Sequence, residues 1–184
     1  MRTGLAIILL TVAASAAGCA ASGESCGPGC PAWARRYGGA APEPPDGRVH
    51  LVCRDILALS PAPLDVQILG TGEIEAHVWV GHAVFISRGL LAAMDDAELQ
   101  AVVAHEMGHV LAASSRMQAG LRGCPIGLEA EVEADRVGRD LVKRNGGNPS
   151  AMLRMLRKVA ASVPADSACE RGLRERIRRL NLDG

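Results

Sequence analysis

The chain of 184 residues is predicted to adopt an α+β fold in a single domain, with a small antiparallel sheet followed by helices. Three short β-forming runs, Val66–Leu69, Ala76–Val80 and Ala83–Ile86, are separated by turns that contain glycine. Beyond them, apolar residues recur at steps of three and four, as in amphipathic helices. Strands that precede a run of helices, instead of alternating with them, are typical of the α+β class.

Helices are predicted on both sides of these strands. Apolar residues at helical spacing predict a first helix over Arg48–Leu59, which ends at Ser60-Pro61. Asp95 stands three residues before Glu98, an acidic variant of the capping box, and predicts that a helix over about Asp96–Ala113 begins here. Three further helices are predicted, at Leu128–Arg144, Pro149–Ala161 and Ala168–Leu180.

The start of the chain has the features of an export signal. Arg2 precedes an apolar stretch, and small residues then lead to Cys19. Residues 16–19, Ala-Ala-Gly-Cys, resemble the lipobox of bacterial lipoproteins, which implies that Cys19 becomes the lipidated first residue of the mature protein. A lipid anchor would hold the protein to a membrane of the cell envelope, facing the periplasm or the outside. A small-residue cleavage site nearby would instead release a soluble exported protein.

The sequence divides into three parts. Residues 1–18 are interpreted as a signal peptide that ends in the lipobox. Residues 19–47 are rich in Gly, Pro, Ser and Ala, a composition that suits a tether because it buries little apolar surface. Residues 48–184 are interpreted as the folded domain.

Composition narrows the choice of partners. The 20 basic and 20 acidic residues cancel, and four aromatic residues are too few for a platform that stacks bases, so no nucleic acid is expected as a partner. Six cysteines in an exported chain suggest disulfides. If Cys19 carries lipid, an odd number of cysteines remains and one thiol stays unpaired, whereas an unprocessed chain allows three bridges.

The segment His105-Glu106-Met107-Gly108-His109 lies in the predicted helix at Asp96–Ala113. Residues four apart on a helix are neighbours, about 5–6 Å apart at Cβ, so two imidazoles can converge on one metal ion. Glu106 falls within the apolar arc of this helix, where an ionised carboxylate is costly unless a cation lies beside it. His-Glu-x-x-His is the arrangement of zinc peptidases, with two ligands and a catalytic base on one helical face.

A third zinc ligand is expected from the helix at Leu128–Arg144. Glu129, Glu131 and Glu133 are all candidates, and spacing alone does not choose among them. Two histidines and a glutamate leave zinc one position for water. Asp135 follows Glu131 by four residues and is placed to accept the free N–H of a ligand imidazole.

The segment Glu131-Val132-Glu133-Ala134-Asp135 matches a Glu-x-x-x-Asp signature. With the His105–His109 motif, and with similarity that runs from about Val66 to Leu180, the chain resembles the zinc metalloendopeptidase family of the CAAX prenyl endopeptidases and the HtpX-like and BepA-like proteases. This resemblance implies a zincin-like fold and one zinc ion held by His105, His109 and Glu131. It also implies that Glu106 is the catalytic base.

The sequence departs from the family pattern at two places. Glu75-Ala76-His77 stands where the family often has Asn-Ala-Phe before its edge strand, and Glu170-Arg171 takes the place of a late His-Pro that precedes Arg176-Ile177. His50, His77 and His82 are assigned to no site, because a lone histidine in a strand or turn is more often structural. Candidates for stabilising a developing oxyanion are Arg171, Arg174 and Arg176.

The function predicted is that of a zinc-dependent metalloendopeptidase acting on envelope or misfolded polypeptides. Zinc would lower the pKa of its bound water from about 15.7 to about 7, and Glu106 would take the proton. An alternative is a zinc-binding chaperone or assembly lipoprotein with little peptidase activity, which the small domain and Glu170 favour. A third reading is a structural lipoprotein whose histidines bind nothing.

Overall fold

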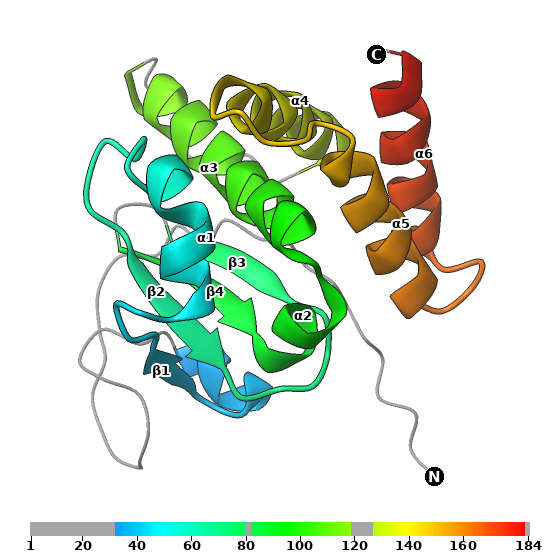
Figure 1. The fold of residues 1–184 in the computed structure, drawn as a ribbon. Coiled ribbons are helices and arrows are strands. Elements are labelled where there is room, and N and C mark those ends of the chain that lie inside the picture. The colour runs from blue at the N-terminus through cyan, green and yellow to red at the C-terminus, as the bar shows by residue number, and fades with distance from the viewer. Residues whose placement is uncertain (1–31, 80–81, 119–126, 183–184) are drawn as a thin grey trace, which may run out of the picture.

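The computed structural model describes residues 32–79, 82–118 and 127–182. Its order of elements confirms the α+β class, with strands followed by helices (Figure 1). The elements are η1 (a 3-10 helix, Ala32–Tyr37), β1 (Ala40–Pro42), α1 (Arg48–Leu57), β2 (Asp65–Leu69), β3 (Ala76–Trp79), β4 (Ala83–Ser87), α2 (Arg88–Ala93), α3 (Asp96–Gln118), α4 (Leu128–Arg144), α5 (Ala151–Ser162) and α6 (Ala168–Leu182). In the described part of the chain, no helix is apolar and long enough to cross a bilayer.

The sheet is mixed, whereas the sequence predicted an antiparallel one. Its strand order is β1-β2-β4-β3, and β4 lies between β2 and β3. β2 therefore runs parallel to β4, with Val66 opposite Val84, while β1 and β3 are antiparallel to their neighbours. β3 and β4 form an antiparallel pair, as predicted. β2 and β3 do not pair with each other, because β4 lies between them.

The sheet has an apolar layer on each face. Residues from alternate positions of the strands, such as Val78 and Val84, join the main core with Leu99, Val103 and Met107 of α3. The other face carries Phe85 and Leu69, packed with Ala34 of η1. In Figure 1, α1 and α3 lie over the sheet, whereas α5 and α6 stand to one side of it.

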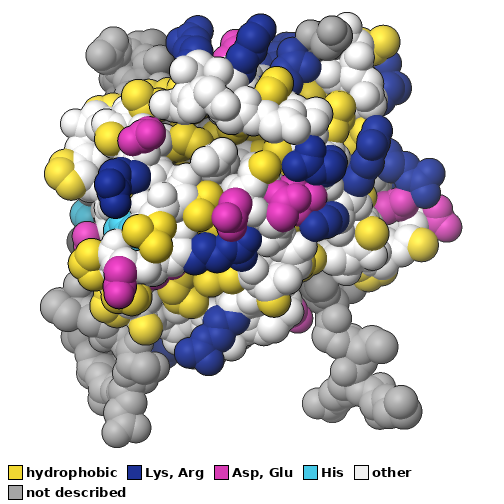
Figure 2. Space-filling view, viewed as in Figure 1, with side chains coloured by type: hydrophobic (Ala, Val, Ile, Leu, Met, Phe, Trp, Pro, Cys, Tyr) yellow, Lys and Arg dark blue, Asp and Glu magenta, His cyan; other side chains and the backbone are white. Residues whose placement is uncertain are grey.

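The beginning of α3 is fixed by the predicted capping box. The Asp95 carboxylate accepts a hydrogen bond from Glu98 N (2.8 Å), and the Glu98 carboxylate accepts one from Asp95 N (2.9 Å). Lys158 of α5 donates to the same buried Glu98 carboxylate, which ties α5 to the start of α3. On the face of the molecule drawn in Figure 2, basic side chains lie beside acidic ones.

The predicted tether is too long. Residues 32–47 belong to the domain, because β1 pairs with β2 and places Ala40 opposite Leu69. The Glu43 carboxylate then caps α1 by accepting hydrogen bonds from Val49 N (2.9 Å) and His50 N (3.0 Å). These backbone and capping bonds order a segment whose composition suggested disorder. The predicted signal peptide 1–18, Cys19 and the rest of the tether lie outside the described residues.

Two glycines allow α3 and α4 to approach each other closely. A Cβ added at Gly108 of α3 would lie 2.7 Å from the Ala134 carbonyl oxygen and 2.9 Å from its Cα. A Cβ added at Gly138 of α4 would lie 2.9 Å from the backbone nitrogen of His105. Since these neighbours are backbone atoms, a side chain at either glycine would force the two helices apart.

Replacing Gly138 by Ala tests this packing. Gly to Ala in a helix interior normally stabilises by about 0.5–1 kcal/mol, but the clash with α3 is expected to reverse the sign and destabilise by about 1–3 kcal/mol. Urea denaturation of the purified protein measures the change. Gly172→Ala in α6 is the matched control, because a Cβ there meets nothing within 4 Å. Equal stability of the two variants would contradict the packing argument.

Candidate metal centre

His105 and His109 face each other on one side of α3. Both are buried, and their rings meet edge to face with centroids 4.7 Å apart. The two Nε2 atoms are 3.1 Å apart. The spacing of four residues has therefore brought two imidazole nitrogens to one point, as the sequence predicted.

Glu131 of α4 completes a group of three ligand atoms. Its Oε2 lies 3.4 Å from His105 Nε2, and its Oε1 lies 3.4 Å from His109 Nε2. One ligand atom from each residue lies within 4.8 Å of the others, a set that could hold a metal ion. Neither Glu131 oxygen accepts a hydrogen bond from the described residues. Two imidazoles and a carboxylate are the donors that zinc takes in catalytic sites, so the residues fit this ion.

The other two acidic candidates face solvent. The Glu131 side chain is 14% exposed, whereas those of Glu129 and Glu133 are 79% and 56% exposed. Glu129 pairs with Arg179 of α6 at 2.8 Å. The structure thus brings Glu131 to the imidazoles, and the choice that spacing left open is made by which face of α4 packs on α3.

Asp135 contacts His105 at Nδ1, and Arg176 in turn contacts Asp135. The Asp135 Oδ1 lies 2.8 Å from His105 Nδ1, and the Arg176 guanidinium donates to both Asp135 oxygens at 2.7 Å. A proton held on Nδ1 by Asp135 leaves the Nε2 lone pair of His105 directed at the ligand group. Asp135 therefore lies where the sequence predicted. The contact of Arg176 with these carboxylates was not predicted, because its partners are far away in the sequence.

Glu106 is fully buried next to this group. Neither of its carboxylate oxygens has a hydrogen-bond partner in the described part of the chain. Burial raises the pKa of this carboxyl, while His105 and His109 act in the opposite direction. A buried carboxylate without donors is costly, and a cation or a water molecule beside it would relieve that cost.

The other charged groups of the centre have shifted pKa values. Burial lowers the pKa of His105, but its close contacts with the Asp135 and Glu131 carboxylates outweigh this effect and raise the pKa to about 9. Burial opposes ionisation of Asp135 as well, yet Arg176 holds its pKa below the usual value. Contacts with both imidazoles likewise keep the pKa of Glu131 low against the effect of burial. Without a metal, the His105 ring is therefore protonated at neutral pH.

The three histidines assigned to no site lie apart from the ligand group. His77 of β3 is buried beside Glu75, with Nε2 and Oε2 3.4 Å apart. His82 packs on the ring of Trp79 at 4.5 Å, and the backbone of His50 takes part in the cap of α1. None of the three belongs to the metal-ligand group found among the described residues.

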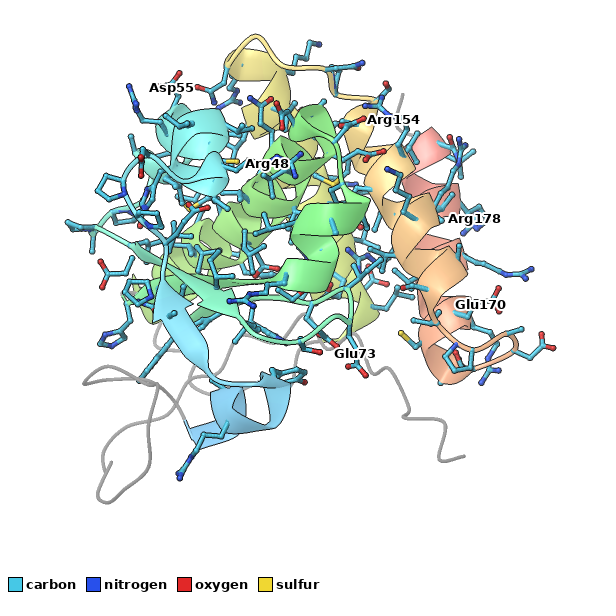
Figure 3. All side chains as sticks on the ribbon, turned by 60° about the horizontal axis from the view of Figure 1, so that its bottom comes forward. Arg48, Asp55, Glu73, Arg154, Glu170 and Arg178 are labelled. Carbon is cyan, nitrogen blue, oxygen red and sulfur yellow. The ribbon has the colours of Figure 1, made fainter. Side chains whose placement is uncertain are left out.

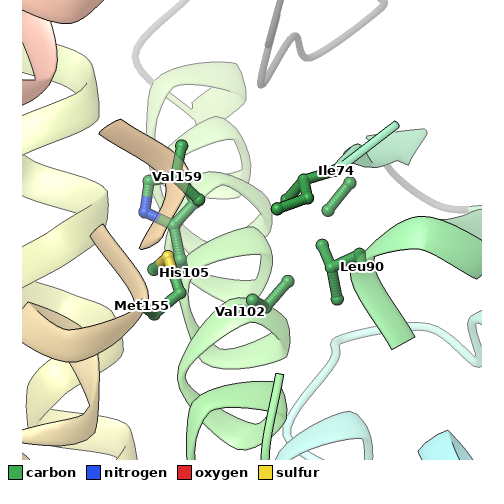
Figure 4. Close-up of a pocket in the computed structure, with 7 residues that line it drawn as sticks. Ile74, Leu90, Val102, His105, Met155 and Val159 are labelled. Atoms are coloured by element: carbon green, nitrogen blue, oxygen red, sulfur yellow. The ribbon is translucent and has the colours of Figure 1, made fainter. Parts of the chain in front are cut away.

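An apolar pocket opens next to His105 (Figure 4). It lies between the beginning of β3, α2, α3 and α5. Its walls are Ile74, Ala76, Leu90, Val102, His105, Met155 and Val159. The volume of this pocket is about 10 Å³, about the space that one water molecule needs, so an aliphatic group could enter only if the lining moved.

Comparison with known proteins gives one family. Residues 45–126 match the model described as Peptidase family M48. The matched residues include His105, Glu106 and His109, whereas Glu131, Asp135 and Arg176 lie beyond them. A search of the curated proteins finds no match. The match therefore covers the part of the centre on α3 and not the parts on α4 and α6.

Glu131→Ala is expected to weaken zinc binding at least about tenfold, because it removes one of three converging ligand atoms. Glu133→Ala, two residues away on the solvent side of α4, is the control and is expected to keep the affinity of the unmodified protein. Competition with a chromophoric chelator measures both dissociation constants. Loss of affinity in the control, or none in Glu131→Ala, would refute this choice of ligand.

Zinc binding is expected to release a proton. The pKa of His105 is raised to about 9, so at neutral pH the metal-free ring is protonated and must lose that proton to bind a cation. Affinity should therefore rise by about one log unit per pH unit between about pH 6 and about pH 8. Calorimetry in two buffers of different ionisation enthalpy counts the protons. An affinity that does not change with pH would show that zinc binding displaces no proton from His105.

Proposed function

We propose that this chain, which matches peptidase family M48 over residues 45–126, is a metalloendopeptidase that uses one zinc ion held by His105, His109 and Glu131. The observation that carries the proposal is the convergence of three ligand atoms beside the buried, unpaired carboxylate of Glu106. Zinc would supply a Lewis acid that polarises a peptide carbonyl and lowers the pKa of water to about 7.

Charge supports a divalent cation at this place. Glu106, Glu131 and Asp135 bring three carboxylates into a buried region, where Arg176 is the one guanidinium that the described residues supply. With neutral imidazoles, two negative charges remain, and a divalent cation balances them. Buried charges persist only when they are paired in this way.

Asp135 and Glu106 have different roles toward protons in the proposed reaction. Asp135 keeps the Nδ1 proton of His105 in place, so that this ring presents Nε2. Glu106, whose pKa burial raises, acts as the general base that accepts a proton from water and later returns it to the leaving amine. Its position three residues before His109 puts the carboxylate on the side of α3 that bears the ligand group.

We propose a polypeptide in extended form as the substrate. β3 lies at an edge of the sheet and, among the described strands, pairs with β4 alone. An extended peptide can add to such an edge through backbone hydrogen bonds. Ala76 of β3 and His105 of α3 both line the small apolar pocket, so this edge of the sheet lies next to the candidate metal centre.

The place of action proposed is the cell envelope. The signal-like residues 1–18 and the lipobox resemblance at Cys19 support export and a lipid anchor. Envelope or misfolded polypeptides would then be the substrates within reach.

Glu106→Gln tests the mechanism. The amide is close in size and cannot accept a proton, so cleavage of a reduced, unfolded protein should fall by about 10²–10⁴-fold while bound zinc stays unchanged. His105→Ala should lose both zinc and cleavage, and Glu133→Gln on the solvent side of α4 should lose neither. New amino termini and the zinc content of purified protein are the measurements. Zinc binding without cleavage that depends on Glu106 would instead indicate a metal-binding chaperone or assembly module.

A further inference from the structure

We propose that Arg176 is a positioning residue of the metal centre, through which α6 holds the carboxylates of Glu131 and Asp135 against the imidazoles. This proposal rests on the proposed function, because it gives Arg176 a role toward the same ion. It goes beyond the ligands by making the last helix of the domain part of the site.

The contacts of Arg176 all go to the site. The side chain is buried, and its Nε and Nη2 donate to the two oxygens of Asp135 at 2.7 Å each. Its Nη1 lies 3.0 Å from Glu131 Oε2. Asp135 in turn lies 2.8 Å from His105 Nδ1. One planar guanidinium thus faces two carboxylates, a geometry that a lysine cannot reproduce.

The two carboxylates need such a cation. Glu131 and Asp135 are four residues apart on α4, so they are neighbours of like charge and repel each other. Both side chains are withdrawn from solvent, which strengthens that repulsion. The Arg176 guanidinium lies 3.0 Å from Glu131 Oε2, so its charge offsets this repulsion and helps to hold Glu131 beside His105 in the absence of a metal.

The same contacts argue against Arg176 as the group that stabilises an oxyanion. All three of its nitrogens already face carboxylates of α4. Arg174 donates to Glu170, and Arg171 donates to the Asp166 carbonyl oxygen. Arg176 is therefore expected to affect the affinity and geometry of the ion rather than to take part in the chemical step.

Arg176→Met and Arg176→Lys of the full chain test the proposal. Arg178→Met is the matched control, because Arg178 leaves α6 on its outer side and pairs with Glu175 at the surface (Figure 3). Zinc affinity is measured by chelator competition, and the absorption bands of the cobalt-substituted protein report the coordination geometry. Circular dichroism checks that each variant is folded.

Arg176→Met is expected to weaken zinc binding by about 10–100-fold and to alter the cobalt spectrum, as the loss of an outer partner does. Arg176→Lys keeps the charge without the planar fork and should recover part of the affinity with a spectrum that still differs from that of the unmodified protein. If Arg176→Met does not fold, the Lys variant carries the test alone. Unmodified affinity and spectrum in a folded Arg176 variant would overturn this proposal and leave the proposed function standing. Failure of the unmodified protein to bind zinc would overturn both.

Discussion

The close contact between α3 and α4 is the constraint on which the centre depends. Gly108 lies against the backbone of Ala134, and Gly138 lies against the backbone at His105. The two helices are therefore close enough for the carboxylates of Glu131 and Asp135 to reach the imidazoles of α3. A wider separation of the helices would leave the same side chains in the sequence but not around one point. The glycine within the metal-binding segment weakens the helix in isolation, and here it serves the packing.

Charge gives the second constraint. The domain buries three carboxylates next to two imidazoles and one guanidinium, an arrangement that is unfavourable unless protons or a cation balance it. Without metal, the raised pKa values of His105 and Glu106 show how protons can provide that balance. With a divalent cation, those protons are no longer needed, and Glu106 can ionise and act as a base. The divalent cation that would balance these buried charges is therefore also the kind of ion that a metallopeptidase needs.

Local sequence signals predicted much of the fold. The capping box at Asp95 and Glu98 fixes the start of α3, and helical periodicity placed α4 at its observed bounds. Features set by distant parts of the chain were not predictable in the same way. The parallel pairing of β2 and β4 depends on where β3 lies, and β1 is ordered by the edge that β2 offers. The motif identified His105, Glu106 and His109 because their spacing is local, whereas the role of Arg176 follows from the packing of α6 on α4.

The central claim is that side chains from two helices meet around a single zinc ion. Anomalous diffraction at the zinc absorption edge, from a crystal of the zinc-loaded protein, locates that ion directly. We expect one zinc bonded to Nε2 of His105, Nε2 of His109 and a carboxylate oxygen of Glu131. Zinc bound elsewhere, or a Glu131 carboxylate turned away from both imidazoles, would contradict it.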